Sequence, residues 1–135
     1  MRFLIDTHYV LWTALNPSEM KPWAHRLLAD LKNEILVSSA SVFEISLKVR
    51  LGKLPAAAEF EGDLLRNIEE KLGFAILPLD PQSMYRAAQF QDKHADPFDR
   101  MIAAQAIQYD LPLLSVDPKL DVFGARRVKK PTGQP

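Results

Sequence analysis

Cysteine is absent from the sequence, which excludes disulfides, thiolate zinc sites and cysteine nucleophiles. A chain without cysteine suits the reducing cytosol, where disulfides do not persist. No apolar stretch reaches the length of a transmembrane helix, and the N-terminus lacks the basic lead and apolar run of a secretory signal. We therefore expect a cytoplasmic protein with no membrane partner.

The chain also lacks a net charge, because its 17 lysines and arginines balance its 17 aspartates and glutamates. Nucleic-acid binding would therefore require a local basic patch. Hydrophobic residues form 47% and charged residues 25% of the 135 residues, a balance typical of a folded globular protein. The length favours a single domain, which we place at residues 1–128. Residues 129–135 include two prolines and a glycine and predict a flexible tail.

Short, almost wholly apolar runs alternate with longer helical patterns along the chain. The runs predict strands at Phe3–Ile5, Ile35–Val37, Phe74–Leu77 and Leu113–Val116. The helical patterns cover Thr7–Leu15, Ser18–Lys32, Ser41–Leu51, Glu59–Leu72, Pro81–Lys93 and Pro97–Tyr109. Apolar strands without polar alternation are typical of a parallel sheet with helices on both faces. The predicted fold class is therefore α/β, a three-layer α/β/α sandwich with a central, mostly parallel sheet.

Acidic residues lie beside the predicted strands. Asp6 and Asp117 come directly after the first and fourth strands. Glu44 lies one turn into the helix after the second strand, and Asp99 lies in the first turn of the helix before the fourth. Open parallel sheets bind ligands beyond the carboxyl ends of their strands, so these acids can converge there. Carboxylates in a partly desolvated crevice repel one another unless a cation neutralises them, and oxygen ligands favour Mg²⁺ or Mn²⁺.

Helix capping offers a second interpretation of several of these acids. Asp96 precedes Pro97 as an N-cap precedes proline at the first helical position, and Asp99 then complements the helix dipole. Asp117 also precedes a proline and fits a turn or cap. Asp80 forms the same Asp-Pro dipeptide with no catalytic expectation, so it serves as an internal control.

Glu44 has two structural alternatives as well. Ser41 and Glu44 match a capping box, and Lys48 lies one turn further on as an ion-pair partner. The sequence leaves cap and ligand open for Glu44. Because Thr7 is available to cap the first helix, an acid at Asp6 has little structural purpose, and Asp6 is the strongest candidate ligand.

The chain resembles the PIN-domain family of metal-dependent ribonucleases over nearly its whole length, and within it the VapC-type toxins of toxin-antitoxin operons. The matching segments are Leu4–His8 (LIDTH), Ser38–Ile45 (SSASVFEI), His94–Ala106 (HADPFDRMIAAQA) and Leu114–Asp117 (LSVD). The third segment is the specific one. The resemblance implies a PIN-like fold and a metal-dependent endoribonuclease, the toxin of a type II toxin-antitoxin pair. Such an enzyme hydrolyses RNA phosphodiester bonds with water activated by Mg²⁺, for which Mn²⁺ can substitute.

The resemblance also assigns roles to particular residues. The implied catalytic acids and metal ligands are Asp6, Glu44, Asp99 and Asp117. Asp96 is an accessory candidate, and Ser115 stands where the family often has a hydroxyl near the metal. Arg100 is a further accessory candidate, which contacts phosphate or, as we favour, forms a surface ion pair.

The implied partners are an RNA substrate, a VapB-like antitoxin and a second copy of the chain in a homodimer. Two basic clusters can supply phosphate contacts: Lys48, Arg50 and Lys53, and Arg126, Arg127, Lys129 and Lys130. His8 and His94 lie near the acids in the sequence, but we treat both as structural. The helix at Thr7–Leu15 is apolar almost all round, so either the next helix, with Trp23, Leu27 and Leu28, or another chain covers its outer side.

Three other functions deserve comparison. A PIN nuclease for RNA maturation or for DNA is the main alternative. A non-catalytic PIN-like interaction module would not need the four acids. A phosphoacceptor receiver domain needs an aspartate after a central strand near the middle of the chain, and residues 56–62 offer no such strand.

Overall fold

The structure is a computed structural model that describes residues 1–91 and 96–131. Within these residues, four strands form one sheet: β1 (Arg2–Ile5), β2 (Glu34–Ser38), β3 (Ala75–Leu77) and β4 (Leu113–Leu114). Their order is β3-β2-β1-β4 and every pairing is parallel, so the predicted sheet is confirmed. His94, and residues 132–135 of the expected tail, lie outside the described residues.

The fourth strand is shorter than predicted, because Ser115 and Val116 leave the ladder. The backbone N–H of Val116 donates instead to Oδ2 of Asp6 at 3.3 Å. A side chain at the end of β1, and not further strand pairing, therefore holds the segment that follows β4.

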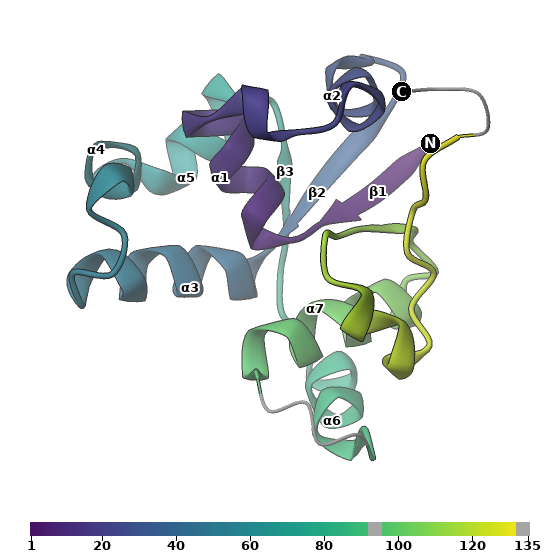
Figure 1. The fold of residues 1–135 in the computed structure, drawn as a ribbon. Helices are drawn as coiled ribbons and strands as arrows, with labels where there is room; N and C mark the ends of the chain where they lie inside the picture. Colours follow the sequence, from purple (N-terminus) through teal and green to yellow (C-terminus); the bar gives the residue numbers. More distant parts are fainter. Residues whose placement is uncertain (92–95, 132–135) are drawn as a thin grey trace.

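Helices connect the strands and cover both faces of the sheet (Figure 1). They are α1 (Thr7–Leu15), α2 (Pro22–Ala29), α3 (Ser39–Arg50), α4 (Ala58–Glu61), α5 (Leu64–Arg66), α6 (Pro81–Gln89) and α7 (Pro97–Gln108). Short 3-10 turns lie at η1 (Pro17–Glu19), η2 (Pro55–Ala57) and η4 (Pro118–Phe123), and η3 (Asn67–Lys71) is a π-helical turn.

Two of the predicted helices are divided in the structure. The pattern at residues 18–32 gives η1 and α2, because Pro22 has no N–H to continue a helix and instead begins a new one. The pattern at residues 59–72 breaks between α4 and α5 at Gly62 and Asp63. Both predictions were wrong because the apolar periodicity continues past residues at which the helical backbone breaks.

Alternating side chains along β1 enter two separate cores. Phe3 and Ile5 pack with residues of α1, α2 and α3, whereas Leu4 packs with Ile102 and Ala103 of α7. Figure 1 shows α1 and α2 on one side of the sheet and α6 and α7 on the other. This arrangement confirms the three-layer sandwich. None of the helices in the described residues is long and apolar enough to cross a membrane.

The first helix is covered by the chain itself over much of its surface. Leu11 and Trp12 pack against the core that holds Tyr9, and the ring centres of Trp12 and Tyr9 lie 5.4 Å apart. The same core takes in Trp23, Leu27 and Leu28. α1 and α2 therefore contribute to one core, and Trp12 packs against it as a partly buried side chain.

A buried glutamine in α7 links the ends of β2 and β3. Nε2 of Gln105 donates to the carbonyl of Pro78 at 2.9 Å, and its Oε1 accepts from the hydroxyl of Ser38. Ser38 in turn caps α3 by accepting from the N–H of Ala40 at 2.9 Å. The sequence does not single out Gln105, whose only signal is a polar residue among alanines on a buried helix face.

Gln105→Leu is expected to lower the free energy of unfolding by about 1–3 kcal/mol, because it removes a buried partner from both Pro78 and Ser38. Gln108→Leu is the matched control, since that half-buried side chain forms exposed hydrogen bonds, to Gln82 at 3.0 Å and to Arg86 at 3.4 Å. It should change the free energy by no more than about 0.5 kcal/mol. Urea denaturation measures both, and equal losses would remove the special role of Gln105.

Candidate functional site

Asp6 joins β1 to α1 and accepts hydrogen bonds from α1 and from the distant segment that follows β4. As the N-cap of α1, its Oδ1 accepts from the N–H of Tyr9 at 3.1 Å. Its Oδ2 accepts from the N–H of Val116 at 3.3 Å. Our expectation that Thr7 is the cap was wrong, because Thr7 is the first helical residue. Asp6 therefore has a structural purpose that the sequence did not reveal.

Asp6 as a residue is only 4% exposed. Burial raises the pKa of Asp6 above its usual value of 3.8, although hydrogen bonds from Ser115, Tyr9 and Val116 oppose the shift. At neutral pH the buried carboxylate therefore carries a desolvation cost that these donors do not fully offset. A cation beside Asp6 would relieve that cost.

Ser115 and Asp117 lie in the segment that follows β4. The hydroxyl of the buried Ser115 bonds to the carboxylate of Asp6, and its Oγ accepts from the N–H of Asp117 at 3.1 Å. Asp117 caps η4, with Oδ1 accepting from the N–H of Lys119 at 2.9 Å. The predicted cap is confirmed, and Ser115 stands where it can orient Asp6.

Glu44 is buried in α3 and contacts α1 through Thr7. Oε1 of Glu44 accepts from the Thr7 hydroxyl at 2.7 Å, and Oε2 lies 2.5 Å from Nζ of Lys48. The predicted pair with Lys48 is confirmed. The capping box is wrong, because Ser38 caps the helix and Ser41 lies inside it, with its Oγ 2.9 Å from the Thr7 hydroxyl.

The start of α7 lies beside α3. Asp96 caps α7, with Oδ1 accepting from the N–H groups of Phe98 and Asp99 at 2.9 and 3.2 Å, as predicted. Asp99 is half-buried in the first turn. The ring of Phe98 lies 5.8 Å from that of Phe43, which is the neighbour of Glu44 in the sequence. Asp99 and Glu44 therefore lie on adjoining turns of two packed helices.

Arg100 holds the end of α6. Its Nε donates to the carbonyl of Ala87 at 3.0 Å and its Nη2 to that of Phe90 at 2.8 Å. The guanidinium also lies 5.8 Å from the ring centres of Phe90 and Phe123. Carbonyls at a helix end have no partner within the helix, so this side chain stabilises α6. The phosphate contact and the surface ion pair of Arg100 stay predictions.

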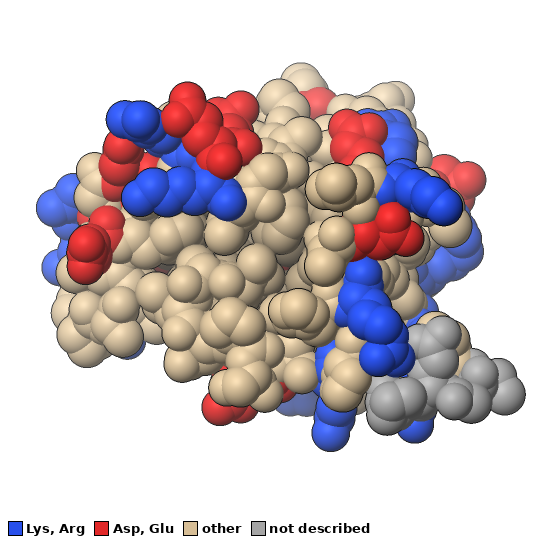
Figure 2. Space-filling model, turned by 90° about the horizontal axis from the view of Figure 1, so that it is seen from above, with Lys and Arg blue, Asp and Glu red and all other residues tan. Residues whose placement is uncertain are grey.

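Ion pairs occupy all three arginines of the two basic clusters. The pairs are Arg50 with Glu61 at 3.3 Å, Arg126 with Asp110 at 3.0 Å and Arg127 with Asp121 at 3.0 Å. Arg127 holds the pKa of Asp121 below its usual range. Figure 2 shows charges of both signs around the margins of a broad, mostly uncharged face. This face therefore offers no large basic field for RNA.

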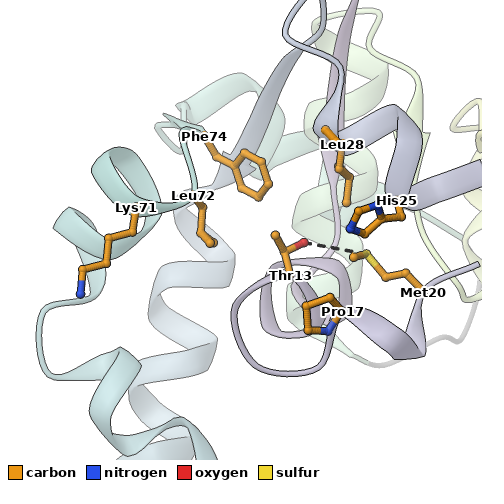
Figure 3. A pocket seen from close by; sticks show the side chains of 9 residues that line it. Thr13, Pro17, Met20, His25, Leu28, Lys71, Leu72 and Phe74 are labelled. Atoms are coloured by element: carbon orange, nitrogen blue, oxygen red, sulfur yellow. Dashed lines mark hydrogen bonds between the residues drawn. The ribbon is translucent and has the colours of Figure 1, made fainter. Parts of the chain in front are cut away.

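Several hollows lie along α1, and one of them adjoins Glu44. This hollow, of about 130 Å³, is lined by Thr7, His8, Leu11, Glu44, Lys48 and Leu54. A second hollow, of about 220 Å³, lies at the other end of α1. Figure 3 shows Thr13, Met20, His25 and Phe74 around it, with the Thr13 hydroxyl 3.9 Å from Sδ of Met20. No carboxylate from the described chain lines this second hollow, so only the first belongs to the candidate site.

The sequence matches the model of the PIN domain over residues 3–125. The chain belongs to the PIN-domain family. No curated protein matches the sequence of this PIN domain. Solved structures are also similar to it, and two of them follow. "Crystal Structure of FitAcB from Neisseria gonorrhoeae" is 23% identical, with 96% of this chain and 97% of that chain covered and a TM-score of 0.65. "Structure of FitAB bound to IR36 DNA fragment" is 21% identical, with 95% and 94% covered and a TM-score of 0.65. These likenesses show a shared fold.

The acids of this PIN domain fit a divalent ion in their chemistry but are not gathered into one cluster. All four carry oxygen donors of the kind that Mg²⁺ and Mn²⁺ prefer. Within residues 1–91 and 96–131, no three His, Asp or Glu side chains are grouped so that they could hold a metal ion. Asp6 and Asp117 bind backbone amides and Glu44 binds Lys48. Mutual repulsion favours such separate partners for carboxylates, so a cation would have to draw them together.

Proposed function

We propose that this PIN domain is a metal-dependent endoribonuclease of the VapC type, the toxin of a type II toxin-antitoxin pair. The buried carboxylate of Asp6 carries the proposal, because its pKa is raised at the carboxyl end of a central strand. Asp80 is the contrasting case of a plain cap. The pKa of Asp80 lies below its usual value. Burial would raise it, but hydrogen bonds from Ser83 and Tyr109 lower it by more.

The proposed metal ligands and catalytic acids are Asp6, Glu44, Asp99 and Asp117, directly or through water. When bound, Mg²⁺ or Mn²⁺ would supply a water of lowered pKa and positive charge opposite the phosphate. Two of these carboxylates are oriented by hydrogen bonds from hydroxyl groups of the chain. Ser115 orients Asp6, and Thr7 orients Glu44. Asp96 fixes the first turn of α7 and so positions Asp99.

A VapB-like antitoxin is the partner that we propose for the outer side of α1. The hollow beside Glu44 and another of about 260 Å³, lined in part by Leu15 and Phe60, lie along this helix. Residues 8, 11 and 15 share one helix face, so the two hollows follow each other along it. An apolar segment laid there would end beside Glu44 and cover the acids.

For the homodimer, we propose the exposed face of α3. Phe43, Leu47 and Leu51 are 59%, 36% and 58% exposed. Their spacing of four residues places them in one apolar stripe on the helix. A second copy that covers this stripe would remove it from water.

The proposed activity predicts cleavage of single-stranded RNA in Mg²⁺ or Mn²⁺ and none after EDTA treatment, because the proposed site contains no side-chain nucleophile. Gel analysis of labelled RNA measures this, with DNA of the same sequence as a control. The proposed antitoxin, sought as the product of a small reading frame next to the gene of this protein, should suppress cleavage when the two are purified together. Activity that survives rigorous metal removal would contradict the mechanism, and cleavage of DNA alone would favour the DNA nuclease.

A further inference from the structure

Lys48 is bonded to one of the carboxylates that we propose as metal ligands. Its Nζ lies 2.5 Å from Oε2 of Glu44, one turn earlier on α3. The other oxygen, Oε1, is held by the Thr7 hydroxyl at 2.7 Å. Each oxygen of Glu44 thus has one partner, and a metal ion that binds Oε2 has to replace the ammonium group.

The two sides of this ion pair differ in freedom to move. The side chain of Glu44 is only 9% exposed and is anchored to α1 through Thr7, whereas that of Lys48 is 40% exposed. Lysine carries its charge on a flexible stem, so its ammonium group can swing outward with little loss of packing. The carboxylate is therefore the fixed side of the pair, and Lys48 is the side that is free to move.

We infer that Lys48 competes with the divalent ion for Glu44 and, once displaced, binds a phosphate of the RNA. A divalent ion attracts the carboxylate more strongly than a single ammonium charge does, so the exchange is downhill at sufficient metal concentration. Lys48 lines the same hollow as Thr7, His8 and Glu44, so the released ammonium group would stay beside it. Lysine binds phosphate as a point charge, which suits an RNA strand drawn to this edge.

The first test measures the binding of Mn²⁺ alone by isothermal titration. Lys48→Met, which removes the competing charge and keeps the stem, should bind Mn²⁺ about twofold to fivefold more tightly, as expected for release from one ion pair. Lys48→Arg keeps a cation beside Glu44 and should bind no more tightly than wild type. Lys32→Met makes the same change of charge just before β2, at the amino ends of the strands and away from the acids. It should leave the affinity for Mn²⁺ unchanged.

Unchanged or weaker Mn²⁺ binding by Lys48→Met would overturn the competition. So would equal tightening in Lys32→Met, since the effect would then come from net charge. If Lys48→Met does not fold, Lys48→Arg still decides, because tighter Mn²⁺ binding by that variant would also overturn it.

The second test measures RNA cleavage at saturating Mn²⁺. Lys48→Met should raise KM severalfold with kcat little changed, and should flatten the slope of log kcat/KM against log salt by about 0.7, the share of one phosphate contact on single-stranded nucleic acid. An unchanged KM and slope would overturn the phosphate contact. This inference rests on the proposed function, but the Mn²⁺ titration needs no RNA. If Lys48 competes with Mn²⁺ at Glu44 but the protein cleaves no RNA, the proposed function is contradicted and the competition is not.

Discussion

Asp6→Asn and Asp99→Asn should each lower RNA cleavage more than about 100-fold, while the protein stays folded. Each substitution replaces a carboxylate that we propose as a direct metal ligand with a neutral amide, and losing even an indirect contact of a metal site commonly costs 10- to 100-fold. In Asp6→Asn the amide oxygen can still accept from Tyr9, so the cap of α1 survives. Initial cleavage rates in Mg²⁺ measure the effect, and circular dichroism checks the fold.

Asp80→Asn is the matched control for this experiment. Asp80 caps α6 by accepting from the N–H of Ser83 at 2.8 Å, as Asp6 caps α1 by accepting from Tyr9. Asp80 is not part of the proposed site, so the Asp80→Asn variant should cleave RNA at a rate close to that of the wild type. A similar loss at Asp80 would mean that capping, and not metal chemistry, accounts for the effect at Asp6.

Mn²⁺ should raise the melting temperature of the wild type by roughly 5–10 °C and that of Asp6→Asn much less. A ligand at a concentration of about 100 times its Kd stabilises the folded state by about 2.7 kcal/mol, and one kcal/mol corresponds to a few degrees in a domain of this size. Without metal the two proteins should melt at similar temperatures. The amide loses the contact with Val116 but removes a charge that burial disfavours.

Thermal melts of both proteins in EDTA and in Mn²⁺ decide this prediction. Ca²⁺ at the same concentration tests whether any divalent ion gives the shift. A mutant that is clearly destabilised without metal, and that keeps the full Mn²⁺ shift, would show that Asp6 acts only as a structural acceptor. The acidic site would then have to be placed elsewhere.

Local patterns in the sequence predicted much of the fold correctly. The bounds of α1 and the start of α7 match the structure, and the Asp-Pro dipeptides at Asp80, Asp96 and Asp117 form the expected caps. These features depend on residues within one helical turn, whose spacing is visible in the sequence. Both helix predictions that crossed a proline or glycine interruption failed for the same reason, because periodicity alone does not register the break.

The start of α3 needed tertiary information. The pattern predicted a capping box at Ser41, whereas the cap in the structure is Ser38, and contacts from other helices hold both serines. Gln105 of α7 accepts from the Ser38 hydroxyl, whereas Thr7 of α1 lies against Ser41 and Glu44. A pattern within α3 contains neither contact, so the sequence left the role of Glu44 open.

The sequence by itself determined the parallel sheet, the positions of the acids after or beside its strands, and the membership of the PIN family over residues 3–125. Apolar periodicity, capping chemistry and family motifs are all properties of neighbouring residues. Only the tertiary structure decided that Asp6 is buried against Val116, that Thr7 of α1 bonds to Glu44, and that Arg100 stabilises α6. Burial and choice of partner depend on segments far apart in the chain, and it is burial that raises the pKa of Asp6 and so favours a cation beside it.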